Sequence, residues 1–261
     1  MQTEREKWNA FSIIEMIFII SIIGILLTIL FPAMGTIKLA ARKVKDVSHL
    51  KKIAEAWREC SIERGWKIDG SKDETVGMLH FAEQLAGRDR GNISDMVLND
   101  PYVYISSGDQ YASKVKSETV CYLNDSIVTG HECFSPATNF MTSDGIITSY
   151  CFMVNLPASV PSDTTPLGFT RGLCENGKWD EKSGLYGAQG GYVVYADGHV
   201  TWFDGDKPVK FLRWDKSNYT SNICEAVPSS TVITCGDVNT CRVETSDGSA
   251  VILHSESAAG T

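Results

Sequence analysis

The stretch FSIIEMIFIISIIGILLTILFPAM, residues 11–34, decides the architecture that we expect for this chain. It contains one charged side chain, that of Glu15, and no Asn, Gln, Lys or Arg. As a helix, residues 11–31 would rise about 31 Å, which matches the roughly 30 Å of hydrocarbon in a bilayer. A cleaved signal peptide fits less well, because its apolar centre is shorter, roughly 7–15 residues. We therefore expect a hydrophobic transmembrane helix over residues 11–34.

Charge divides the rest of the 261-residue chain unevenly. The net charge is −8, from 24 Lys and Arg against 32 Asp and Glu. Residues 35–67 carry nine basic and four acidic side chains, whereas residues 68–261 carry 13 basic and 25 acidic ones. An apolar fraction of 43% argues against a disordered chain. The excess of acidic over basic side chains also argues against a nucleic acid as a partner.

Glu15 is the informative residue of the apolar stretch. A charge in a membrane segment costs on the order of 2.5–3.5 kcal/mol at the helix centre, so such a residue usually has a partner and a function. Residues 11–34 offer no Lys or Arg to neutralise it. A free α-amino group would serve, if the chain were cut just before the apolar stretch.

Residues 10–34, AFSIIEMIFIISIIGILLTILFPAM, resemble the N-terminus of type IV pilins and type II secretion pseudopilins. The resemblance implies that residues 1–10 are a leader, which a prepilin peptidase removes by cutting between Ala10 and Phe11. It also implies that the new amino terminus at Phe11 is N-methylated. In an adjacent subunit this amino group would pair with Glu15, so that neither charge is left alone in lipid. The family usually has Gly at the position of Ala10.

This resemblance implies a structural protein and not an enzyme. The chain would be a subunit of a type IV pilus-like or type II secretion pseudopilus filament, assembled through its N-terminal helix, in which Pro32 lets the helix loosen. Its partners would be other pilin-like subunits, the inner-membrane assembly platform, the prepilin peptidase and, before assembly, the lipid bilayer. Its location would be the bacterial inner membrane, as a single-pass protein with a periplasmic head, and then a periplasmic pseudopilus or surface pilus.

Two alternatives stay open at this point. The chain could be a low-abundance minor or tip pilin whose large head binds a ligand or a surface. It could also be a membrane-anchored periplasmic protein that does not assemble. The orientation is a further open question, because the basic residues that follow the apolar stretch would, counted alone, place the head in the cytoplasm.

Beyond the apolar stretch the periodicity becomes that of an amphipathic helix. Apolar side chains recur on one face while Lys and Arg occupy the others. The apolar positions of this face are Ile37, Ala40, Ala41, Val44, Val47, Leu50, Ile53, Ala54 and Trp57. We expect an amphipathic stalk over residues 35–65, part of a continuous helix from about residue 12 to 63. Leu50, Ile53 and Trp57 should pack on the sheet of the head.

Residues 66–261 predict a mostly β head. A short helix is expected at 78–87, and strands are expected at 102–105, 120–122, 146–154, 192–196, 199–203, 209–214, 231–234, 241–244 and 251–254. The Asp197-Gly198 dipeptide predicts a tight hairpin. It also matches half of a His-x9-Asp-Gly signature of pilin-like proteins, with Gly187 at the position of the His. The predicted fold class is α+β: a long N-terminal helix, hydrophobic in its N-terminal half as a membrane or filament core, packed on a pilin-like antiparallel sheet.

The cysteines predict disulfides. All eight lie at position 60 or later, which favours an oxidising compartment for that part of the chain. Cys121 with Cys133, and Cys235 with Cys241, could each close a short loop. The connectivity of the other four cannot be deduced from the sequence.

Metal and catalytic sites find little support in the sequence. Asp204 and Asp206 are weak candidates for Ca²⁺, since closely spaced carboxylates suit a hard cation, but a simple turn is the favoured interpretation. The five histidines are scattered and no Ser lies in a Gly-x-Ser-x-Gly motif. We therefore expect no cofactor and no catalytic residue.

Overall fold

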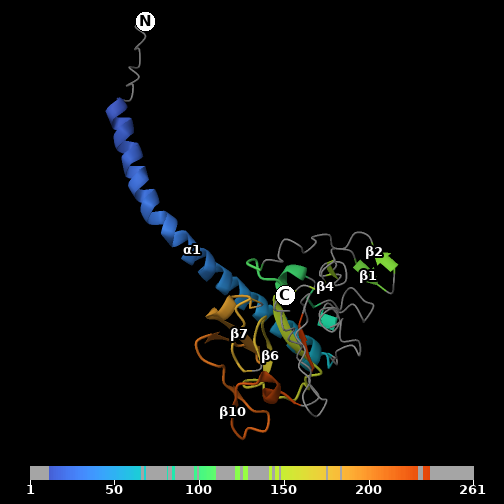
Figure 1. Ribbon diagram of the computed structural model, residues 1–261. Helices are drawn as coiled ribbons and strands as arrows, with labels where there is room; N and C mark the ends of the chain where they lie inside the picture. The colour runs from blue at the N-terminus through green and yellow to red at the C-terminus, as the bar shows by residue number, and fades with distance from the viewer. Residues whose placement is uncertain are drawn as a thin grey trace, which may run out of the picture. The chain divides into compact units, whose positions relative to one another are not determined.

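A computed structural model provides the structure of the chain (Figure 1). It describes residues 12–65 without the side chains of residues 29, 32 and 33, and residues 68, 81, 84–85, 97–98, 100–109, 121–123, 126–128, 141–142, 145–146, 148–228 apart from 175 and 183, and 232–235. Contacts divide the chain into two compact units, residues 1–44 and 45–261, and each is described by itself. The expected leader, with Ala10 and Phe11, lies outside the described residues.

One helix dominates the N-terminal part of the chain. Helix α1 spans Ile13–Arg58 and continues as a π-helical turn, Glu59–Glu63. After it, Gly65 has a φ of 66°, the left-handed conformation that glycine adopts at the ends of helices. These bounds agree with the helix expected over residues 12–63.

The expected fold class is wrong in one part. We expected the N-terminal half of the helix to be a long hydrophobic membrane segment. Over the part of the chain that the structure describes, no helix is long and apolar enough to cross a membrane. The α+β class itself stands, because α1 occurs together with antiparallel sheets.

The main sheet has five antiparallel strands in the order β11-β5-β6-β7-β8. In chain order the strands are β5 Tyr150–Val154, β6 Pro166–Thr170, β7 Gly190–Tyr195, β8 Val200–Asp204 and β11 Val232–Cys235. Strands β7 and β8 form the expected hairpin, in which Tyr192 lies opposite Trp202 and Gly198 has a φ of 91°. Among the described residues, three two-stranded sheets pair β1 Cys121–Leu123 with β2 Ser126–Val128, β3 Met141–Thr142 with β4 Gly145–Ile146, and β9 Phe211–Leu212 with β10 Tyr219–Thr220.

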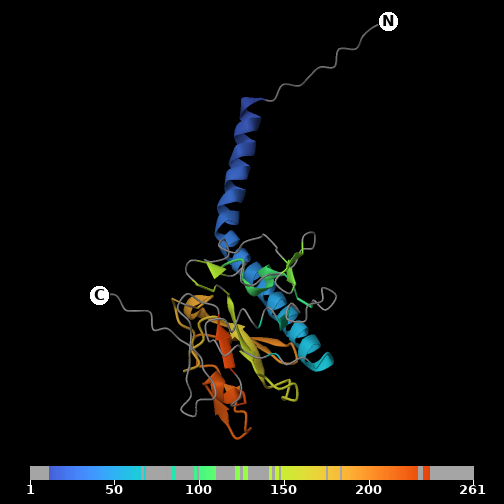
Figure 2. The same cartoon turned by 90° about the vertical axis from the view of Figure 1, so that its right-hand side faces the viewer.

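The core of the second unit lies between the C-terminal part of α1 and the main sheet (Figures 1 and 2). Leu50, Ile53 and Trp57 are buried, which confirms the face predicted from the apolar periodicity. The ring of Phe81 stacks on that of Phe152 in β5, with 5.0 Å between the ring centroids. Burial of these side chains supplies most of the favourable free energy that holds a helix on a sheet.

Several strand predictions differ from the structure. Residues 102–105 were expected to form a strand but lie mostly in a 3-10 helix, Pro101–Tyr104, because Asp100 accepts a hydrogen bond from the Tyr102 N–H and Pro101 has a φ suited to a helix start. The sequence pattern also missed the central strand β6. The strands expected at 241–244 and 251–254 lie outside the described residues.

Gly168 in β6 provides a first test of this packing. A Cβ at this position would lie 2.5 Å from Cδ1 of Phe152 and 2.7 Å from the carbonyl oxygen of Cys151. We therefore expect Gly168→Ala to lower the free energy of unfolding by about 1–3 kcal/mol in chemical denaturation. Gly35→Ala is the matched control, because no heavy atom lies within 4 Å of its added Cβ and Ala favours the helix. Equal stability of the two variants would contradict the packing described.

Candidate functional site

Glu15 lies at the start of α1 and is bonded within its own chain. The backbone N–H of Ser12 donates to Oε2 of Glu15 over 2.9 Å, and the N–H groups of Glu15 and Met16 donate to the Ser12 carbonyl. This is half of a capping box, in which the side chain at the third helical position satisfies the N–H of the N-cap residue. Glu15 therefore has a local structural role besides the intersubunit pairing implied by the resemblance.

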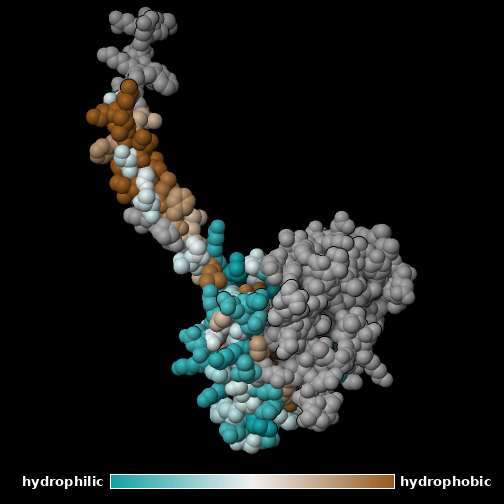
Figure 3. Space-filling view, viewed as in Figure 1, coloured by the Kyte–Doolittle hydropathy of each residue, from teal (hydrophilic) through white to brown (hydrophobic). Residues whose placement is uncertain are grey.

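Around Glu15, the helix of the first unit exposes large apolar side chains. The exposed fractions reach 79% for Ile13, 70% for Phe18 and 66% for Phe31. Figure 3 shows hydrophobic residues on much of this helix surface. Contiguous apolar surface of this kind is rare on monomeric soluble proteins and marks contact with another protein or with lipid. Pro32 lies within α1, and its side chain is outside the described residues.

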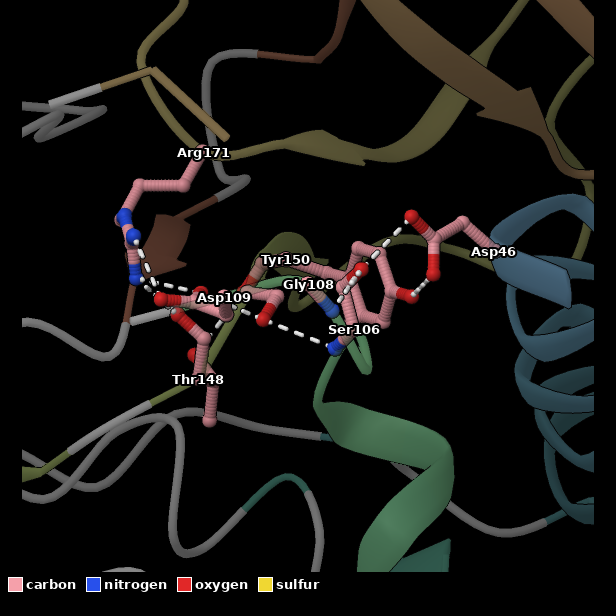
Figure 4. Close-up of polar contacts among 8 residues, drawn as sticks. Asp46, Ser106, Gly108, Asp109, Thr148, Tyr150 and Arg171 are labelled. Carbon is pink, nitrogen blue, oxygen red and sulfur yellow. Dashed lines mark hydrogen bonds and ion pairs between the residues drawn. The ribbon is translucent and has the colours of Figure 1, made fainter. Parts of the chain in front are cut away.

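The second unit contains a buried polar network centred on Asp46 of α1 (Figure 4). The Asp46 side chain is fully buried, yet it accepts three hydrogen bonds. Ser106 Oγ donates to Oδ2 over 2.8 Å and Tyr150 Oη donates to Oδ1 over 3.0 Å. The hydroxyl of Tyr186 also donates to Oδ2. Asp46 thus ties the helix to three distant segments of the head.

A second carboxylate, that of Asp109, extends this network. Arg171 forms a buried ion pair with it, with 3.1 Å between Nη1 and Oδ2, and Ser149 Oγ donates to Oδ2 over 2.6 Å. The two carboxylates are connected, because the Ser106 N–H donates to Ser149 Oγ over 2.9 Å. We define the buried polar network by its residues: Asp46, Ser106, Asp109, Ser149, Tyr150, Arg171 and Tyr186.

The geometry suits a structural role. Asp46, Ser106 and Ser149 are fully buried, so none of them presents a polar atom to a solute. Burial, and next the Asp46 carboxylate beside it, raise the pKa of Tyr150 well above its usual value of 10. The Tyr150 hydroxyl therefore remains a hydrogen-bond donor at any physiological pH. A buried carboxylate is costly to desolvate unless its oxygens are satisfied, and here the hydroxyl donors satisfy them.

His49 lies one helical turn after Asp46 and is also buried. Its Nδ1 lies 3.5 Å from the Tyr150 hydroxyl oxygen, whose proton is directed at Asp46. Burial lowers the pKa of His49 below its usual value of 6.5, although the neighbouring Asp46 carboxylate acts in the opposite direction. The imidazole is therefore neutral at neutral pH.

Of the two candidates for Ca²⁺, Asp204 has another contact and Asp206 is exposed. Asp204 accepts a hydrogen bond of 2.6 Å from Nε1 of Trp202, and Asp206 is exposed at the following turn. Among the described residues, no group of three or more His, Cys, Asp or Glu side chains could hold a metal ion. Binding of Ca²⁺ at Asp204 and Asp206 stays an alternative to the simple turn that the sequence favours.

The cysteine predictions lie mostly outside the described side chains. Cys121 and Cys235 have a described backbone, in β1 and β11, but the side chains of the two expected pairs with Cys133 and Cys241 are not described. Cys151 in β5 is disulfide-bonded. Cys60, at the end of the helix, is buried.

Local sequence patterns did not predict the buried polar network. One signal could have found its centre, because Asp46 and His49 precede Leu50 and Ile53 by four residues each and so continue the apolar face of the helix toward its N-terminus. A carboxylate on the buried face requires partners in the core. The identity of those partners depends on contacts between segments 60 to 140 residues apart, which no local pattern reveals.

Comparisons with protein-family models, with curated proteins and with solved structures found no match.

Asp46→Asn tests the buried polar network. The amide of Asn has one oxygen and an NH2 group, so at least one of the hydroxyls of Ser106, Tyr150 and Tyr186 would lose its acceptor. We expect the free energy of unfolding to fall by about 2–4 kcal/mol in urea denaturation. Asp204→Asn is the control, because its exposed amide oxygen still accepts from Trp202, and it should change stability by less than about 0.5 kcal/mol. A tolerated Asp46→Asn would mean that the network does not hold α1 to the head.

Proposed function

We propose that this protein is a structural subunit of a type IV pilus-like or type II secretion pseudopilus filament. The observation that carries the proposal is the exposed apolar surface of α1 in the first unit, on a helix that begins at a Ser-x-x-Glu cap. Copies of the same helix packed side by side would remove these side chains from water. The pilin-like sequence of residues 10–34 supports the same conclusion.

The apolar surface of α1 in the first unit favours a filament over a closed oligomer. A helix surface that is apolar on many sides can contact several neighbours, and head-to-tail contacts that do not close generate helical filaments. In this proposal Glu15 would pair with the amino group of a processed neighbour, where it compensates a charge that would otherwise lie in an apolar surrounding. The C-terminal part of α1, whose Leu50 and Trp57 are buried in the head, would carry the head on the filament.

The proposal extends to processing, partners and location. A prepilin peptidase would cut between Ala10 and Phe11, and Phe11 would be N-methylated. The partners would be other pilin-like subunits and an inner-membrane assembly platform. The head would be periplasmic, where the disulfide at Cys151 would form readily. The proposed role is structural, so the chemistry of maturation would belong to the peptidase.

Substitutions at Glu15 test whether its charge, and not only its role as a helix cap, is needed for assembly. Glu15→Gln retains the acceptor for the Ser12 N–H but removes the charge, whereas Glu15→Ala removes both. We expect both variants to reduce the subunit in sheared or periplasmic filaments by at least about tenfold, because each lacks the charge that pairs between subunits. Glu55→Gln, an exposed change on the same helix, should assemble normally. The measurement is quantitative immunoblotting of the filament fraction from the native host.

Intact-mass analysis of the wild-type protein from host membranes accompanies this test. An N-methylated chain that begins at Phe11 is the expected result. If Glu15→Gln assembles as the wild type does, the charge is not needed and Glu15 acts as a cap only. If the wild type retains Met1 beside an active peptidase and forms no filament, the proposed function is wrong.

A further inference from the structure

The contact between α1 and the head contains a titratable group that the filament proposal does not use. His49 is 6% exposed and lies beside the Asp46 carboxylate, which accepts hydrogen bonds from hydroxyl groups in three segments of the head. We infer that His49 makes the attachment of residues 45–58 to the sheet acid-sensitive, so that protonation of its imidazole loosens the helix from the head. This inference does not depend on whether the protein forms filaments.

The geometry leaves a protonated His49 poorly accommodated. Nδ1 of His49 lies 3.5 Å from the Tyr150 hydroxyl oxygen, a distance too long for a strong hydrogen bond. The Asp46 oxygens already accept from hydroxyl groups, Oδ1 from Tyr150 and Oδ2 from Ser106 and Tyr186, and none of the described hydrogen bonds joins His49 to either oxygen. An imidazolium would therefore be a buried charge without a direct acceptor among the described residues, unless the network rearranged.

The charges that face His49 are mixed. On its own helix, Lys45 and Lys52 repel an imidazolium, whereas Asp46 attracts it, as does Asp100 from the segment before the 3-10 helix. Tyr150 and Tyr186 face the same carboxylate as neutral donors, and Tyr192 of β7 lies within its electrostatic influence. Asp109 is engaged by Arg171. Burial outweighs these opposing charges, so the pKa of His49 lies below 6.5 in the folded protein.

The direction of the pH effect follows from linkage. Above pH 6.5 the imidazole is mostly neutral in both the folded and the unfolded chain, so its titration does not lower the free energy of unfolding. As the pH falls below 6.5, the unfolded or locally opened chain takes up the proton first, which favours opening. The opening constant then rises by up to about tenfold for each unit that the pH falls, until the pH reaches the lower pKa of His49 in the folded state.

Hydrogen exchange of the full chain in mild detergent tests the inference. The opening constant of the amides of residues 45–58, corrected for intrinsic exchange rates, is compared at pH 7.5 and pH 5.5. In the wild type it should rise several-fold, up to about tenfold. In His49→Asn, whose amide does not titrate but can donate toward Tyr150, it should stay constant. His199→Asn, a change at an exposed imidazole beside Asp197, should respond as the wild type does.

Two results would overturn the inference: a wild-type opening constant that is equal at both pH values, or a full wild-type response in His49→Asn. Should His49→Asn fail to fold, an NMR titration of the wild-type imidazole replaces it. A midpoint below pH 6.5, together with increased exchange of residues 45–58 over the same range, supports the inference. A midpoint at or above 6.5 refutes it.

Discussion

The head depends on one buried carboxylate. Asp46 is placed by helix α1 in the interior of the second unit, where an unsatisfied charge would cost several kcal/mol. Its partners Ser106, Tyr150 and Tyr186 follow it by 60, 104 and 140 residues in the sequence. The carboxylate is therefore satisfied only when the helix, the segment after the 3-10 helix, strand β5 and the segment before β7 are all in place. This requirement specifies one arrangement of helix and sheet in a way that apolar packing alone does not.

The two ends of α1 differ in which of their side chains are buried. Near Asp46 the helix has one buried face, where Leu50, Ile53 and Trp57 meet the sheet and where polar groups are allowed only with partners. In the first unit the apolar side chains are exposed on many sides, and the charge of Glu15 is bonded to the backbone of its own first turn. The first part of the helix is thus suited to contacts made after folding. The second part is a component of the folded head.

Local sequence patterns were sufficient for the helix and for the β7–β8 hairpin. The repeat of Leu50, Ile53 and Trp57 predicted the buried face, and Asp197-Gly198 predicted the turn, because both depend on residues that are neighbours in the sequence. Strand β6, PLGFT, was missed because it is buried on both sides and shows no alternation. Residues 102–105 look like a strand by composition, but the cap formed by Asp100 before Pro101 starts a 3-10 helix instead. Asp46 could be suspected from the helical periodicity, whereas its hydroxyl partners could not be.

The three hydroxyls around Asp46 also constrain how this sequence can diverge. A lineage that replaced the acid by an apolar residue would leave Ser106, Tyr150 and Tyr186 with buried hydroxyls that lack their acceptor, so each of those positions would then come under selection to change. The four positions should accordingly vary as a set: acid with hydroxyls in one branch, apolar side chains at all four in another. Mixed combinations should be scarce among relatives. Such a pattern would identify related heads even where the rest of the sequence has drifted beyond recognition.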